Sequence, residues 1–184
     1  MAESTFSEII NLYRKMDHAW DSIAQTYSFA CTGCEDNCCQ SLFYHHTHIE
    51  RAFLLNGFHR LDPEKQKQIR RNAKAYCDQT FAGGNTTQSF RLICPVNEAG
   101  RCLLYPYRPM ICRLHGLPHE VCRPGSEPVK GPGCDAGRFD EKKYTPFDRT
   151  SFYREMAQIE MAFRQQNRLN QKVKLTVAQI ILSE

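Results

Sequence analysis

The residues best suited to chemistry in this chain are its cysteines, of which there are 10 among 184 residues. Eight of them fall into two blocks, and these are Cys31, Cys34, Cys38, Cys39, Cys94, Cys102, Cys112 and Cys134. Thiolates gathered from two distant stretches of a chain are a typical ligand set for a zinc ion or an iron–sulfur cluster. The sequence therefore predicts a cysteine-ligated metal centre.

Disulfides are the alternative interpretation of the same cysteines. The first residues, MAESTFSEIINLYRK, are acidic at Glu3 and Glu8 and have no continuous apolar stretch, so they do not resemble a signal or transit peptide. No apolar run approaches the roughly 20 residues that a membrane span needs. We therefore expect a cytoplasmic protein without a membrane partner, in a compartment where reducing conditions disfavour disulfides.

The spacing within the first block sets limits on how it binds metal. Cys31 and Cys34 form a Cys-x-x-Cys pair, which lets two thiolates reach one ion from a tight turn that Gly33 eases. Cys38 and Cys39 are adjacent, and adjacent side chains tend to point apart, so they need not serve the same ion. Two centres with four cysteines each, or one centre with other cysteines left over, are both open.

The second block contains the segment CLLYPYRPMICR, which runs from Cys102 to Arg113. Four thiolates around a zinc ion or an oxidised four-iron cluster leave a net charge of about minus two, which is costly to bury. Arg108 and Arg113 flank Cys112, so their guanidinium groups are placed to donate hydrogen bonds to sulfur. Arg101 and Tyr105 are further candidates, although a surface arginine and an aromatic cap on the core explain them as well.

In their order along the chain, these residues are similar to the YkgJ-type cysteine-cluster family. That family combines a Cys-x-x-Cys-x-x-Cys-Cys block, a distant cysteine, a Cys-x-x-Tyr-x-x-Arg-Pro-x-x-Cys-Arg segment and a final cysteine. The similarity covers residues 31–137 and implies a zinc- or iron-chelating domain in which all eight cysteines bind metal, with Tyr105, Arg108 and Arg113 beside the centre. Some members are labelled iron–sulfur oxidoreductases, and the flagellin lysine methylases have a similar motif. One difference lies within the first block. Three residues separate Cys34 from Cys38, where the family has two.

Other candidate ligands lie outside this pattern. Cys77 falls on an apolar helical stripe, so we expect a small buried side chain that binds no metal. Cys122 lies among the candidate ligands and stays open as one. A histidine that completes a three-cysteine site is also open, and the histidines near the cysteines are His45, His46, His48 and His115.

The apolar periodicity predicts a mainly α fold with little strand. The first predicted helix covers residues 6–27, and the second begins at Thr47 and stops at Asn56-Gly57. The third begins at Asp62-Pro63 and breaks at Gly83-Gly84-Asn85. A fourth is capped by Asp148, and a fifth covers residues 177–182 after Thr176.

Between Ser89 and Gly137 prolines and glycines alternate, which leaves room for little regular structure beyond a short strand over residues 90–93. So long a loop is unusual inside a compact domain, and metal ligation is what would order it. We therefore predict a single small helical domain over residues 1–184. Its irregular, metal-stapled core, residues 31–137, is flanked by N- and C-terminal helices.

Two functions fit these observations. The formal charge of +4 is small and evenly spread, which argues against a nucleic-acid partner. The favoured function is an iron–sulfur protein that transfers electrons or forms the metal-bearing part of a small redox or modifying enzyme, and Cys94-Pro95 matches the Cys-Pro that ends ferredoxin cluster motifs. The alternative is a zinc-stapled module that binds a protein partner without catalysis. The pattern names neither a catalytic residue nor the redox or protein partner.

Overall fold

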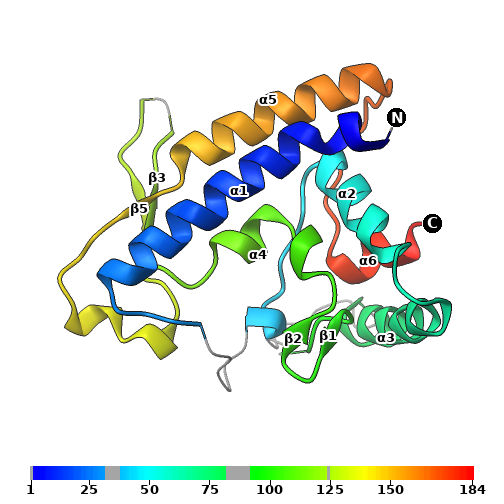
Figure 1. Cartoon of the computed structure of the whole chain (residues 1–184), viewed down its shortest axis with the longest axis horizontal. Helices are drawn as coiled ribbons and strands as arrows, with labels where there is room; N and C mark the ends of the chain where they lie inside the picture. The colour runs from blue at the N-terminus through cyan, green and yellow to red at the C-terminus, as the bar shows by residue number, and fades with distance from the viewer. Residues whose placement is uncertain (1, 32–37, 82–91, 124) are drawn as a thin grey trace. The chain divides into compact units, whose positions relative to one another are not determined.

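The structure is a computed structural model of residues 1–184, and it describes all of them except residues 1, 32–37, 82–91 and 124 (Figure 1). Helices make up 56% of it and strands 9%, so the predicted mainly α class is confirmed. The chain forms two compact units: unit 1 consists of residues 1–36 and 110–169, and unit 2 of residues 37–109 and 170–184. The single domain over residues 1–184 stays a prediction.

Unit 1 is built on a long N-terminal helix, α1 (Ala2–Thr26), which contains all of the helix predicted over residues 6–27 except Tyr27, a turn residue. Helices α4 (Met110–Leu114) and α5 (Thr150–Gln166) both pack against it, and Figure 1 shows α5 running alongside α1. The face of α1 that they cover carries Ile9, Leu12 and Met16, all fully buried. Removal of these side chains from water is what holds the three helices together.

A small sheet completes unit 1. Its strands β3 (His119–Val121), β4 (Val129–Gly131) and β5 (Phe147–Asp148) lie in the order β4-β3-β5. Strand β3 is antiparallel to β4 and parallel to β5. Two short 3₁₀ turns, η3 (Asp135–Gly137) and η4 (Phe139–Glu141), connect β4 to β5.

The predicted start of α5 was wrong by one residue. Asp148 ends β5, and Arg149 occupies the N-cap position. The Asp148 carboxylate still accepts a hydrogen bond of 2.8 Å from the Thr150 amide. The Asp148 side chain, one residue before the N-cap, therefore satisfies an amide of the first turn that has no partner inside the helix.

Unit 2 packs three helices around one apolar core. Helices α3 (Pro63–Phe81) and α6 (Val177–Leu182) lie against each other, and α2 (His48–Phe58) contacts α6. The smaller elements are η1 (Cys38–Gln40), β1 (Asn97–Glu98), β2 (Arg101–Cys102) and η2 (Tyr105–Tyr107). The buried core residues are Leu54, Phe58, Ile69, Ala73, Val96, Leu104, Val177, Ala178, Ile180 and Ile181.

The predicted helix starts in unit 2 are confirmed. The Thr47 hydroxyl accepts a hydrogen bond from the Glu50 amide at the start of α2. The Asp62 carboxylate accepts one of 2.9 Å from the N–H of Glu64, the second residue of α3. Thr176 and Gln179 form a full capping box at α6, in which each side chain bonds to the other residue's amide. Each side chain satisfies an amide that has no partner inside its helix.

The predicted stop of α2 at Asn56-Gly57 was wrong, because the helix runs on to Phe58. Gly57 serves packing here: a Cβ at this position would lie 2.3 Å from ring carbons of Tyr107. The Tyr107 ring also packs against Phe53, with 5.0 Å between ring centroids. The missing side chain therefore makes room for an aromatic ring instead of ending the helix.

The segment from residue 89 to 137 contains more structure than predicted. Of the strand expected over residues 90–93, the last two residues are irregular and the first two lie outside the described residues, as does the break at Gly83-Gly84-Asn85. A hairpin forms instead at β1–β2, where the Asn97 side chain accepts a hydrogen bond of 3.1 Å from the Gly100 amide. Gly100 has φ of 81°, a conformation that favours glycine.

Isolated apolar residues anchor the same segment. Val96 and Leu104 are buried in unit 2, and Leu114 and Leu117 are fully buried in unit 1. They stand singly between prolines and glycines, so they show no period that sequence analysis could detect. Apolar contacts therefore account for part of the order of this segment, for which metal ligation was the expected cause.

We expect Gly57→Ala to destabilise the protein, although alanine is the better helix former by about 1 kcal/mol. The added methyl group must displace the Tyr107 ring, and overpacking of this kind costs about 1–3 kcal/mol. Urea unfolding of the wild type, Gly57→Ala, Tyr107→Ala and the double variant measures the coupling. If Gly57→Ala raised the unfolding midpoint in the wild-type background, the proposed packing role of Gly57 would be refuted.

Candidate cysteine metal centre

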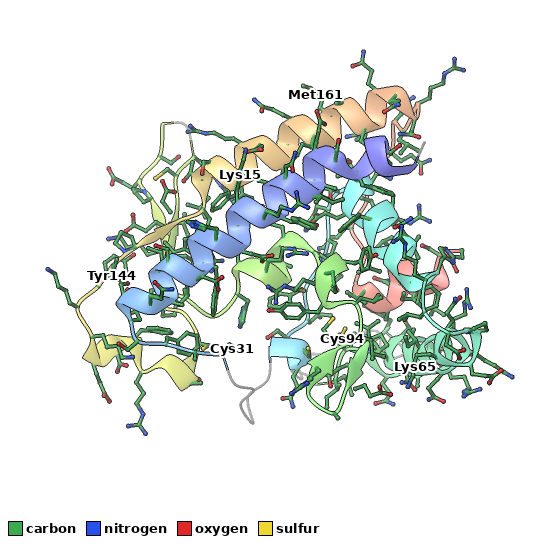
Figure 2. The ribbon with its side chains drawn as sticks, in the orientation of Figure 1. Lys15, Cys31, Lys65, Cys94, Tyr144 and Met161 are labelled. Atoms are coloured by element: carbon green, nitrogen blue, oxygen red, sulfur yellow. The ribbon has the colours of Figure 1, made fainter. Side chains whose placement is uncertain are left out.

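Three predicted ligands come together in unit 2: Cys39, Cys94 and Cys102. The Cys94 amide donates a hydrogen bond of 2.8 Å to the Cys39 carbonyl, which ties the segment before β1 to η1. The Asn97 amide donates one of 2.9 Å to the Cys94 carbonyl, and Asn97 pairs with Cys102 across the β1–β2 hairpin. Figure 2 labels Cys94 next to this hairpin. Backbone contacts therefore bring together cysteines that are up to 63 residues apart (102 − 39).

The thiols of this group influence one another electrostatically. Burial raises the pKa of the Cys94 thiol from 9.0 to about 12, a hydrogen bond from the Val96 backbone acts in the opposite direction, and Cys39 and Cys102 add to the rise. Negative charges on neighbouring sulfurs therefore repel one another in an enclosed site. A bound cation removes this repulsion, and the Val96 N–H stabilises the thiolate that would bind it.

Among the residues that the structure describes, no three His, Cys, Asp or Glu side chains already stand in a metal-binding arrangement. Cys39 and Cys102 are thus close enough to raise the pKa of Cys94, although the three thiols do not have coordination geometry. Cys38 precedes Cys39 in η1, and its side chain lies outside the described part of the chain. An all-sulfur donor set of this kind fits a zinc ion or an iron–sulfur cluster.

The other predicted ligands belong to unit 1. Cys31 is exposed after α1, Cys112 is half-buried on α4, and Cys134 is half-buried at the start of η3. The Cys134 amide donates a hydrogen bond of 2.9 Å to the Gly116 carbonyl. Cys34 was also predicted as a ligand and lies outside the described residues.

The two cysteines without a counterpart in the family pattern are placed differently. Cys77 packs against the core of unit 2, but it is partly buried where a buried side chain was expected. In the β3–β4 ladder, His119 pairs with Gly131 at one end and Val121 pairs with Val129 at the other. Cys134 lies three residues past Gly131, beyond the first end, and Cys122 lies just past Val121, beyond the second end. At about 3.4 Å per strand residue, Cys122 is more than about 10 Å away from Cys134. The two cannot share an ion in this arrangement.

The predicted cofactor-binding residues make other contacts. The Arg113 side chain is buried, pairs with Asp17 of α1 at 2.6 Å and stacks over the Tyr13 ring at 4.0 Å. Arg108 stacks over the Tyr105 ring at 3.8 Å, and Tyr105 is 57% exposed. Arg113 thus fastens α4 to α1, which positions Cys112 indirectly.

The histidines near the cysteines show no common site in the described residues. His45 is buried, its backbone pairs with Leu175, and burial lowers the pKa of its ring to about 4. The His48 ring bonds to the Gln171 carbonyl at 2.8 Å, whereas His46 is exposed. The pKa of His115 is lowered, first by burial and then by the charge of Arg149.

Arg149 is a charged residue of unit 1 that sequence analysis missed. It is 2% exposed, and its guanidinium donates to the Leu114 and Leu117 carbonyls. Burial lowers its pKa to about 10. Within the described residues, no carboxylate pairs with it and its Nε has no hydrogen-bond partner. An arginine beside a helix start gives no sequence signal of this burial.

No protein-family model, curated protein or solved structure matches this chain. The similarity to the cysteine-cluster family therefore rests on the residues of the motif alone. None of the helices in the described part of the chain is long and apolar enough to cross a membrane.

We expect Arg113→Met to lower the free energy of unfolding by about 2 kcal/mol, because it removes the charge-assisted contact with Asp17 and the stacking of the guanidinium on the Tyr13 ring. Asp17→Asn should also destabilise the protein, and the two effects should not add. Urea unfolding of the two variants and the double variant measures this, with metal content as a second readout. Loss of metal in Arg113→Met, with full metal in Asp17→Asn, would contradict a purely structural role.

Proposed function

We propose that this chain binds metal through cysteine thiolates, with an iron–sulfur cluster as the favoured group. The observation that carries this proposal is the convergence of Cys39, Cys94 and Cys102 in unit 2. These cysteines come from a 3₁₀ turn, an irregular segment and a β-strand, and backbone hydrogen bonds link all three segments. Thiols gathered in this way, without disulfides between them, suit a soft metal.

The surroundings of Cys94 support a cluster in particular. A backbone N–H bonds to its sulfur, and hydrogen bonds to cluster sulfurs are one of the means by which proteins set a reduction potential. The Cys94-Pro95 dipeptide and the similarity to the cysteine-cluster family also favour iron over zinc. The proposed role is electron transfer, or the metal-bearing part of a small redox or modifying enzyme, with a redox or protein partner still to be identified.

Anaerobic purification tests the proposal directly. We expect a brown protein with visible absorption, acid-labile sulfide and iron. Cys94→Ser should lose metal, because it removes a thiolate from the centre, whereas Cys77→Ser should retain the wild-type amount at a stability cost of about 1 kcal/mol. Cys77 is a matched control, because it is also a partly buried cysteine of unit 2.

The results of this experiment distinguish an iron–sulfur cluster from a zinc ion, and either of them from a protein that binds no metal. A colourless protein with stoichiometric zinc that depends on Cys94 would replace the cluster by a zinc-stapled module. Equal metal loss in Cys94→Ser and Cys77→Ser would contradict the ligand assignment. A wild-type protein that takes up neither iron with sulfide nor zinc would refute the proposal.

Metal removal should expose the hairpin before the helices. Residues 94–102 form a hairpin of two short strands that buries one core residue, Val96, and carries two proposed ligands, whereas α3 and α6 share a larger apolar core. Hydrogen exchange of the metal-free and metal-bound protein should therefore show lost protection at residues 94–102 and little change in α3. Equal protection of residues 94–102 in both forms would show that the metal does not order this segment.

A further inference from the structure

We infer that the chain has a second, separate metal centre in unit 1, built on Cys31, Cys112 and Cys134. This inference rests on the proposed function, because it assumes that the cysteines bind metal. It goes further by assigning the number of centres and the division of the ligands between them.

The boundaries between the units divide both cysteine blocks. One boundary falls between residues 36 and 37, inside CTGCEDNCC, and another between residues 109 and 110, inside CLLYPYRPMICR. Each unit thus receives cysteines from both blocks. Cys31, Cys112 and Cys134 fall in unit 1, and Cys39, Cys94 and Cys102 fall in unit 2. One metal centre within each compact unit agrees with this division.

The segments that carry the unit 1 cysteines meet around one turn. The Trp20 indole N–H donates a hydrogen bond of 2.9 Å to the His115 carbonyl, and its ring packs against Phe29. A Cβ at Gly116 would lie 4.0 Å from the Cys134 sulfur and 4.0 Å from rings of Phe29 and Trp20. The sulfur of Cys134 and the ring of Phe29 are therefore both next to Gly116.

The other two cysteines are close to this point along the chain. Cys31 follows Phe29 by two residues, so their Cα atoms are at most about 7 Å apart. Cys112 is the middle residue of α4, and His115 follows the helix three residues later, which places their Cα atoms about 5 Å apart. Gly116 itself has φ of 103°, which favours glycine, and its carbonyl accepts the Cys134 amide.

A buried cation faces the same turn. The Arg149 guanidinium donates to the Leu114 and Leu117 carbonyls, on either side of Gly116, and is 2% exposed. No carboxylate pairs with it in the described part of unit 1. A buried charge is costly without an opposite charge nearby. A thiolate centre with a net negative charge at Cys134 would supply one.

The backbone also bears on the two adjacent cysteines. An arrangement with Cys38 and Cys39 in different centres is one of the expectations from sequence. Both belong to η1 and follow the boundary at residue 36, so both are part of unit 2. The division between centres therefore falls before this pair and not inside it.

The experiment compares metal content in the full chain. Anaerobic reconstitution with iron and sulfide, and separately with zinc alone, is followed by metal analysis of the wild type, Cys102→Ser, Cys134→Ser and the double variant. We expect each single variant to keep about half of the wild-type metal and the double variant to keep none. Cys122→Ser is the control and should keep all of it.

Exposed Cys31 provides a second variant in case Cys134→Ser does not fold, as judged by circular dichroism. Cys31→Ser should also lose about half of the metal. Wild-type metal content in a folded Cys134→Ser or Cys31→Ser variant would overturn the second centre while leaving the proposed function intact. Complete loss in Cys102→Ser would overturn it as well. A wild type without metal would refute the proposed function itself.

Discussion

Two backbone hydrogen bonds bring distant cysteine-bearing segments together, one in each unit. The Cys94 amide bonds to the Cys39 carbonyl in unit 2, and the Cys134 amide bonds to the Gly116 carbonyl in unit 1. Closing long loops costs conformational entropy, so such contacts need support from packing around them. Val96 and Leu117, both buried close by in sequence, give that support. Ordinary packing and hydrogen bonding thus position these segments without the contribution of a metal.

Charge is the second constraint on the two units. In unit 1, Arg113 is buried against the Asp17 carboxylate, so its charge is compensated locally. Arg149 is buried with carbonyl oxygens as its partners. Carbonyl dipoles satisfy its hydrogen bonds but carry no net charge, so its compensation is incomplete. This contrast is why Arg149, and not Arg113, is the better candidate to balance a thiolate centre.

The sequence predicted the parts of the fold that depend on local chemistry. Thr47, Asp62 and Thr176 begin helices because each side chain satisfies an adjacent amide, and that signal is local. Gly57 was misread as a helix stop because its reason for being glycine is the Tyr107 ring, which lies 50 residues away (107 − 57). Tertiary contacts of this kind leave no pattern in a single sequence.

The same distinction holds for the candidate site. Cysteine spacing named Cys39, Cys94 and Cys102 among eight candidate ligands, but it did not single out these three as the group that converges in unit 2. It did not reveal that Arg113 binds Asp17 or that Arg149 is buried, since both follow from how α4 and α5 pack against α1. The assignment of cysteines to separate units likewise depends on the path of the chain and not on spacing.

X-ray absorption at the metal edge of the anaerobically purified protein tests the central claim most directly, because it reports the ligand atoms themselves. Thiolate ligation predicts a first shell of sulfur at about 2.3 Å, as is usual for metal–thiolate bonds. An iron–sulfur cluster adds an iron–iron distance beyond that shell. A first shell of only nitrogen and oxygen atoms would contradict cysteine ligation.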